Sequence, residues 1–138
     1  MRELPGQLNQ PELEELFSGP STLVSILAET EQPLDRAEEI AAGLPEEDKV
    51  EALAAHPRIG EPSPEQHGGD PAVLTELAYL NQVYEEKFGF RFVVFVAGRP
   101  RHEVLEVLRE RIGNTREKEL ETGIRELVEI AQDRWLRR

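Results

Sequence analysis

The stretches "PAVLTELAYLNQVYEEKFG", residues 71–89, and "FRFVVFVAG", residues 90–98, decide the expected fold. The first begins with the N-cap and N1 pair Asp70-Pro71 and ends at a glycine, which is typical of a helix. At helical spacing, one side of it carries Leu74, Leu77, Ala78, Asn81 and Tyr84. The second stretch breaks that pattern, because it is short, β-branched and aromatic, and bounded by glycines. We therefore expect a long helix followed by one buried extended segment at about residues 91–97.

Six further stretches place apolar residues at helical spacing, with proline and glycine between them. Ser21 is a candidate N-cap for one of them, and Asn114 or Thr115 is a candidate for the last. The stretches cover residues 11–17, 19–29, 33–44, 45–56, 100–113 and 114–138. The chain has 138 residues, which fits one domain over 1–138. These patterns predict an all-α single-domain bundle of about seven helices with one buried extended segment.

The charge balance limits the classes of function. The formal net charge is −12 and the pI is about 4.7, which argues against nucleic-acid binding because phosphate binding needs a basic face. The longest apolar run, residues 92–97, is too short to cross a bilayer, and the first ten residues lack a signal-peptide core. With no cysteine, disulfides and thiol chemistry are excluded. We expect a cytoplasmic protein that binds neither nucleic acid nor membrane.

His56 is the first candidate for chemistry. Imidazole is the side chain that titrates near neutral pH, so it is the usual general acid or base. His56 ends a predicted helix, and Pro57 directly after it disfavours the α conformation at His56. The ring would thus leave the helix at a defined angle. The alternative interpretation is an ordinary helix stop, since histidine in a last turn followed by proline is a common C-terminal signal.

Residues 57–70 form the one long irregular stretch, and loops of that length are often functional. The loop contains Ser63, Glu65, Gln66 and His67. Glu65 could orient His56, and Gln66 could bind an amide of a substrate; the alternative is a solvated polar loop. A metal site is not indicated, because no helix carries a His-x-x-x-His pair, and His102 is expected at the surface.

The extended segment and Arg134 are the remaining candidates. An extended chain in a helical protein leaves backbone N–H and C=O groups that need partners, and a polar ligand can supply them. Gly98 would let such a ligand approach the backbone. Arg134 lies near the apolar side of the last helix, where an arginine needs an anionic partner unless its head group reaches water.

Four motifs taken together resemble one enzyme family. They are "HPRIGE" at 56–61, Ser-Pro-Glu-Gln at 63–66, "LNQVYEEKFGFRFVVFVAGR" at 80–99 and "VLRERIGNTREKELETGIRELVEIAQDRW" at 107–135. In this order they resemble the 2-oxo-4-hydroxy-4-carboxy-5-ureidoimidazoline (OHCU) decarboxylases, which carry out the last step from urate to (S)-allantoin. The resemblance implies an all-α lyase without a cofactor, commonly a homodimer, acting on a small anionic ureidoimidazoline.

The resemblance also implies roles for individual residues. His56 matches the catalytic histidine of the family, and Pro57 lines the pocket beside it. Glu65 and Gln66 match a pair that contacts the substrate, with Glu65 positioned to act on the imidazole. Arg134 matches an arginine that faces the substrate from the last helix. The backbone that binds the ureido and ring amides is matched by Val94, Phe95, Val96, Ala97 and Gly98.

Two departures from the family pattern keep other interpretations open. The gap between His-Pro and Glu-Gln is shorter than in relatives, and Ala97 is small. The alternatives are a non-catalytic helical binding module of the same fold and a lyase for a related ureido or imidazoline acid. The direction of Glu65 and Gln66 relative to His56 would discriminate among them. An anionic substrate would need local cations in this acidic chain, and Arg134 and Arg58 are the candidates.

Overall fold

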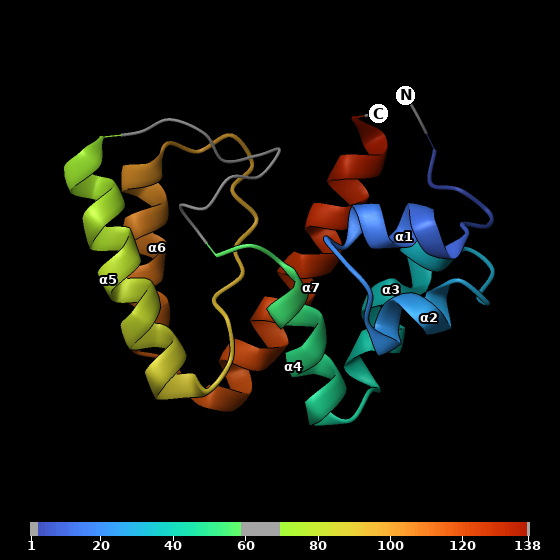
Figure 1. The fold of residues 1–138 in the computed structure, drawn as a ribbon, viewed down its shortest axis with the longest axis horizontal. Helices are drawn as coiled ribbons and strands as arrows, with labels where there is room; N and C mark the ends of the chain where they lie inside the picture. The colour runs from blue at the N-terminus through green and yellow to red at the C-terminus, as the bar shows by residue number, and fades with distance from the viewer. Residues whose placement is uncertain (1–2, 59–69, 138) are drawn as a thin grey trace.

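Seven helices make up the fold in a computed structural model that describes residues 3–58 and 70–137 (Figure 1). The described residues form no β-strand, so the all-α prediction is confirmed. The helices are α1 Gln10–Leu16, α2 Thr22–Leu27, α3 Pro33–Ala42, α4 Glu46–Ala55, α5 Pro71–Phe88, α6 Arg101–Ile112 and α7 Arg116–Leu136.

Polar caps set the starts of four helices. The side chain of Ser21 accepts the Val24 N–H, and that of Asp70 accepts the Ala72 N–H, as predicted. Asn9 begins α1 with a capping box that sequence reading did not identify. For α7 the structure selects Thr115, whose hydroxyl accepts the Lys118 N–H. Short-range signals therefore account for where these helices start.

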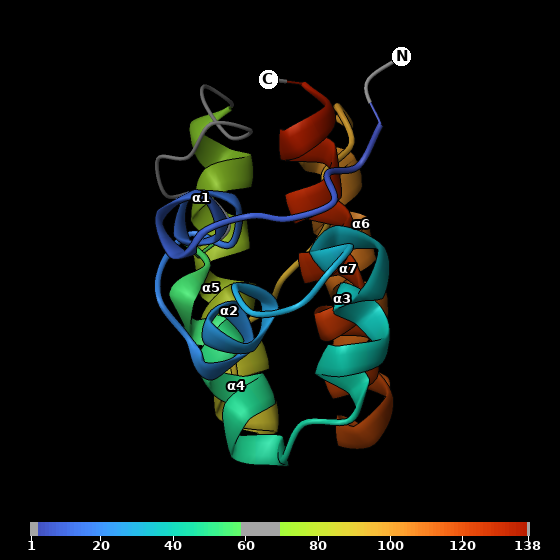
Figure 2. The ribbon, with the colours of Figure 1, turned by 90° about the vertical axis from the view of Figure 1, so that its right-hand side faces the viewer.

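Helix α7 runs through the middle of the molecule and packs against α1, α3 and α4, while α5 pairs with α6 (Figures 1 and 2). Gly123 of α7 permits a close approach to α4. A Cβ atom at this glycine would lie only 3.3 Å from Leu53 Cδ2. Both ends of the described chain lie at one end of the molecule, where the Trp135 indole N–H donates to the Glu3 carbonyl at 2.9 Å.

The chain between α5 and α6 is extended and crosses the core, as predicted for about residues 91–97 (Figure 1). Residues 92–94 are buried, and Phe95 and Val96 are partly buried. The expectation of burial is wrong at Ala97, which is exposed with φ 52° and forms a turn with Gly98 at φ 77°. Ala78, on the side of α5 that also carries Leu77 and Asn81, is exposed.

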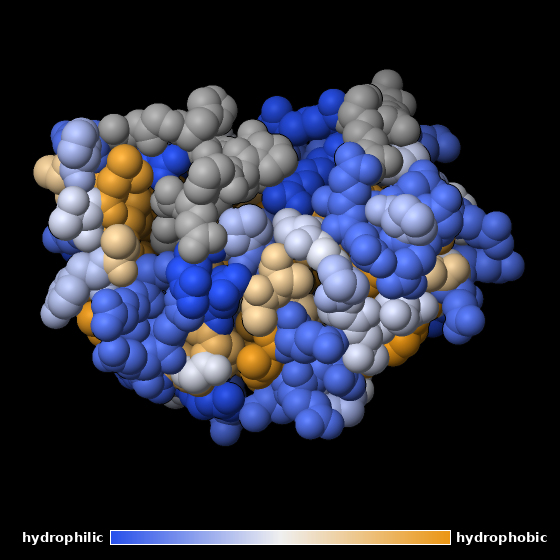
Figure 3. All heavy atoms as spheres, viewed as in Figure 1, coloured by the Kyte–Doolittle hydropathy of each residue, from blue (hydrophilic) through white to orange (hydrophobic). Residues whose placement is uncertain are grey.

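One face of the molecule is largely polar. Figure 3 shows a face on which hydrophilic residues predominate, with small separate apolar clusters. Exposed large apolar side chains in the described ranges are Ile26, Tyr79 and Leu136. Among residues 3–58 and 70–137, no helix combines the length and apolar character needed to cross a membrane.

Candidate functional site

His56 is the C-cap of α4. Its backbone is extended, with φ −78° and ψ 139°, as expected for a residue before proline. Its N–H donates to the Leu53 carbonyl at 3.2 Å, which closes the last turn of the helix. The residue is only 4% exposed, although imidazole is polar, and Pro57 beside it is partly buried. The end of α4 thus places the imidazole ring inside the protein, and the backbone conformation of His56 fixes the direction in which the ring leaves the helix.

Arg91 fixes this helix end from the extended segment. One guanidinium nitrogen, Nη1, donates to the carbonyls of both Ala54 and His56, each at 2.7 Å. Carbonyls in the last turn lack helical partners, and a cation is favourable there because of the helix dipole. Arg91 therefore ties the main chain of His56 to the segment that follows α5.

A tight turn after α1 lies next to the end of α4 and also binds Arg134. Ser18 has φ 68° and Gly19 has φ 147°, and a Cβ atom at Gly19 would lie 3.7 Å from Ala55 Cβ. The Arg134 Nη1 donates to the Leu16 carbonyl at 3.1 Å and to Ser18 Oγ at 2.7 Å. The turn at 16–19 therefore lies between the end of α4 and Arg134, which is partly buried on α7.

The predicted binding backbone at 94–98 is partly engaged by the protein itself. The Phe95 N–H donates to Glu126 Oε1 of α7 at 2.7 Å. The Phe95 carbonyl accepts Arg99 Nη2 at 2.5 Å, and the Val96 carbonyl accepts Arg99 Nε at 3.0 Å. The Phe95 N–H is therefore used by Glu126, whereas Val94 lies buried in the core.

A buried charged network supports the extended segment. Arg111 Nε of α6 pairs with Glu119 Oε1 at 2.7 Å, and their side chains are 7% and 0% exposed. The same carboxylate accepts the Tyr84 hydroxyl at 2.7 Å and Asn114 Nδ2 at 2.8 Å. Burial, and then the hydrogen bond to Glu119, raise the pKa of Tyr84 well above its usual value, so Tyr84 stays a protonated donor.

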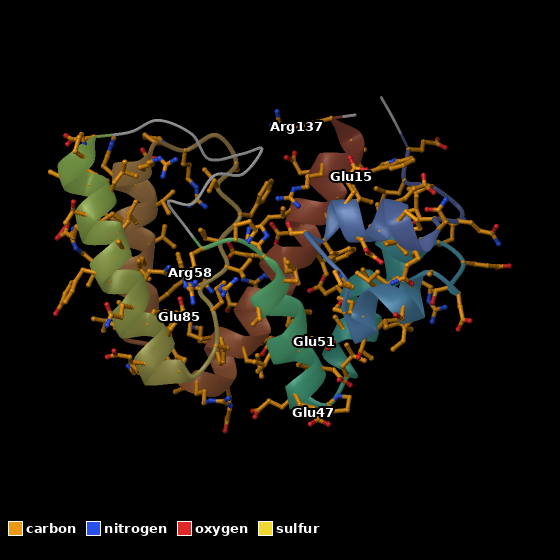
Figure 4. All side chains as sticks on the ribbon, in the orientation of Figure 1. Glu15, Glu47, Glu51, Arg58, Glu85 and Arg137 are labelled. Atoms are coloured by element: carbon orange, nitrogen blue, oxygen red, sulfur yellow. The ribbon has the colours of Figure 1, made fainter. Side chains whose placement is uncertain are left out.

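Arg58, the second candidate cation, is already in an ion pair. Its Nε lies 2.8 Å from Glu85 Oε2 of α5, and Figure 4 shows the two side chains together. The pair borders a hollow of about 500 Å³, lined by Arg58, Ala78, Asn81, Gln82, Glu85 and Glu86. Glu85 therefore offsets the charge of Arg58 where the two side chains meet.

The remaining predicted residues divide into two groups. His102 is exposed at the start of α6, as expected. Ser63, Glu65, Gln66 and His67 lie outside the described residues.

Sequence reading missed the groups that hold this region in place, namely Arg91, Ser18, Arg111 and Glu126. For Arg91 a signal existed, because it is the one charged residue in the otherwise apolar stretch 90–98. For Glu126 there was no signal, since its partner lies 31 residues away in sequence. The arrangement places the His56 imidazole at the end of α4 and the Arg134 guanidinium on the other side of the turn at 16–19. An acid/base and a cation of this kind suit proton transfer to a small anionic molecule.

Comparison with known proteins gives concordant results. The model of the OHCU decarboxylase family matches residues 9–136. A uric acid degradation bifunctional protein of Arabidopsis thaliana is 35% identical over 102 residues, which cover 62% of this chain and 32% of the plant protein. An OHCU decarboxylase of Halalkalicoccus jeotgali is 30% identical over 95 residues, covering 60% of this chain and 54% of that protein. The chain thus spans about a third to a half of the length of these relatives.

Solved structures agree with the fold. A crystal structure of an OHCU decarboxylase in the presence of (S)-allantoin superposes with a TM-score of 0.79 at 29% identity, covering 89% of this chain and 94% of that chain. A crystal structure of an (S)-allantoin synthase has a TM-score of 0.72 at 23% identity, covering 92% of this chain and 48% of that chain, which is a likeness of fold.

Proposed function

Because this chain belongs to the OHCU decarboxylase family, we propose that it converts 2-oxo-4-hydroxy-4-carboxy-5-ureidoimidazoline to (S)-allantoin, as a carboxy-lyase in urate breakdown. The match of the family model over 9–136, together with the buried His56 at the end of α4, carries this proposal. We also propose that the enzyme is cytoplasmic, which remains an expectation from the sequence.

The chemistry is within reach of these residues without a cofactor. Breaking the carbon–carboxylate bond releases CO2 and leaves an electron pair beside an imine, and the heterocycle takes up that pair. One proton delivered to one face then completes a single enantiomer of the product. His56 is the general acid/base for the substrate hydroxyl and for this proton. The fixed exit of His56 from α4 supports delivery from one side only.

Other groups would bind the substrate and stabilise the developing charge. Arg134, anchored on Leu16 and Ser18, supplies the cation. Pro57 lines the pocket beside His56, by resemblance to the family. The backbone of Val94, Val96, Ala97 and Gly98 supplies donors and acceptors for the ureido and ring amides. From the loop, Glu65 orients the imidazole and Gln66 binds an amide, by resemblance to the family.

The test follows the appearance of optical activity. Substrate is generated freshly from urate by the two preceding enzymes, and circular dichroism then records (S)-allantoin, because spontaneous decay gives a racemate without a signal. We expect a rising signal with the wild-type protein and a loss of at least about a hundredfold in rate for His56→Asn. His102→Asn is the matched control, since His102 is exposed on α6, and it should retain the wild-type rate.

Two results would contradict the proposal. A flat trace from folded wild-type protein would reject the decarboxylase and favour a binding module or a lyase for a related acid. An unchanged rate in His56→Asn would reject this histidine as the general acid/base.

We further propose that two copies of the chain form a homodimer, on the basis of the resemblance to the family. Sedimentation equilibrium should then give twice the chain mass of 15.7 kDa. A mass of one chain at micromolar concentration would reject the dimer.

A further inference from the structure

The extended segment is held along one of its two backbone edges by charged side chains. Arg111 Nη1 of α6 donates to the Val93 carbonyl at 2.8 Å, and the Phe95 N–H donates to Glu126 Oε1 of α7 at 2.7 Å. In extended chain, the N–H and C=O of one residue point to the same edge, and alternate residues share that edge. Residues 93 and 95 therefore turn their polar backbone groups toward α6 and α7.

Arg111 is itself immobilised. Its Nε pairs with the fully buried Glu119, its guanidinium carbon lies 4.7 Å from the centre of the Phe92 ring, and its Nη1 lies 3.4 Å from Glu126 Oε2. A buried pair with further hydrogen bonds on both partners is geometrically well defined. Glu126 therefore accepts the Phe95 N–H from a position that Arg111 fixes.

The consequence concerns the opposite edge, to which Val94 and Val96 turn their backbone groups. The Val96 carbonyl already accepts Arg99 Nε at 3.0 Å, so the consequence is for Val94 and the Val96 N–H. We infer that Glu126 is a positioning residue, which fixes the register of the segment so that Val94 and the Val96 N–H, and not Phe95, present backbone groups to the substrate. The inference rests on the proposed function and explains why Phe95 does not belong to its binding backbone. Without the Glu126 acceptor, the Phe95 N–H would be buried without its partner, and the segment would shift to satisfy it.

Two substitutions separate the acceptor role of Glu126 from its charge. Glu126→Gln keeps an oxygen for the Phe95 N–H but turns its amide nitrogen toward Arg111, so the charge contact at 3.4 Å is lost. We expect KM to rise by no more than about threefold, with kcat within about threefold of wild type. Glu126→Leu removes the acceptor, and we expect KM to rise by about tenfold or more with kcat changed less, because binding groups are displaced. Glu121→Leu, on the exposed side of α7, is the control and should match the wild-type protein.

Hydrogen exchange provides a readout that does not depend on turnover. A peptide covering residues 92–96 should be protected in the wild-type protein and in Glu126→Gln, and should exchange at least about tenfold faster in Glu126→Leu. If Glu126→Leu does not fold, Glu126→Asp serves in its place. The aspartate keeps the charge but withdraws the oxygen by one methylene group, and it should raise KM in the same way.

The outcomes are distinct. The inference is overturned if the wild-type protein is active and Glu126→Leu, or Glu126→Asp in its place, shows the wild-type KM and the wild-type hydrogen exchange. Equal losses in Glu126→Leu and Glu126→Gln also overturn it, since they would assign the effect to charge. Inactive wild-type protein would reject the proposed function. Hydrogen exchange would then still test the role of Glu126, and protection of residues 92–96 in Glu126→Leu would overturn the inference.

Discussion

At the scale of the residue, the position of His56 depends on a side chain from a distant part of the sequence. Pro57 sets the backbone conformation of His56, and Arg91 holds the carbonyls of Ala54 and His56. A hydrogen bond from a charged donor contributes more than a neutral one, roughly 1.5–3 kcal/mol. The imidazole is therefore placed by its main chain, which Arg91 prevents from fraying at the last turn of α4.

Replacing Arg91 tests this dependence. Arg91→Met keeps the aliphatic stem but loses both hydrogen bonds, and we expect about 1–3 kcal/mol lower free energy of unfolding and a clear fall in kcat/KM. Arg91→Lys should recover part of both, because an ammonium group still favours the helix end. Denaturant unfolding and the optical assay measure the two effects. Arg36→Met removes an exposed pair with Glu39 and should change neither; a fully stable and active Arg91→Met would contradict the expectation.

At the scale of the element, the end of α5 decides where the extended segment begins. Gly89 has φ 80° and its N–H donates to the Glu85 carbonyl, so it is a left-handed C-cap. Nothing lies within 4 Å of a Cβ atom placed there, so a side chain would meet no steric obstacle. The demand for glycine at this position is therefore one of backbone conformation alone.

Gly89→Ala should lower the free energy of unfolding by about 1–2 kcal/mol, because a residue with a Cβ atom is less stable than glycine in the left-handed conformation. Gly89→Asn should cost less, since asparagine tolerates this conformation better. Thermal and urea unfolding measure both. Gly43→Ala is the comparison, because Gly43 ends α3 with a negative φ of −86°. Equal effects of alanine at the two glycines would show that the φ angle is not the cause.

The elements also show what sequence could predict here. Ser21, Asp70 and Thr115 were accessible as helix starts because a cap is a contact over two or three residues. His56 was accessible because its proline follows directly. The supports of the site were not, since Arg91 reaches Ala54 over 37 residues and Glu126 reaches Phe95 over 31. Only the packed fold brings such partners together, and Ala97 shows how a turn ends an apolar run earlier than its composition suggests.

At the scale of the whole molecule, the net charge of −12 opposes the approach of the proposed anionic substrate. The Debye length falls from about 30 Å at 0.01 M salt to about 8 Å at 0.15 M. Salt therefore removes the repulsion by distant carboxylates before it weakens contacts with an arginine a few ångströms away. Long-range repulsion should dominate the salt dependence.

We expect KM to fall by roughly two- to threefold when ionic strength rises from about 0.01 M to 0.15 M, with kcat unchanged. The optical assay measures both constants, in sodium chloride and in tetramethylammonium chloride, so that specific effects of the cation are separated. A KM that rises with salt would show instead that local attraction by arginine outweighs the charge of the whole molecule.

The contact between the two ends of the described chain has a spectroscopic consequence. Trp135 is the sole tryptophan, and its indole N–H is bound to the carbonyl of Glu3 on the N-terminal segment. Its emission therefore reports on the seating of that segment against the end of α7, whereas far-UV ellipticity reports on all seven helices. Superimposable fluorescence and ellipticity curves would make the first residues part of one cooperative unit, and an earlier fluorescence transition would reveal a fraying end.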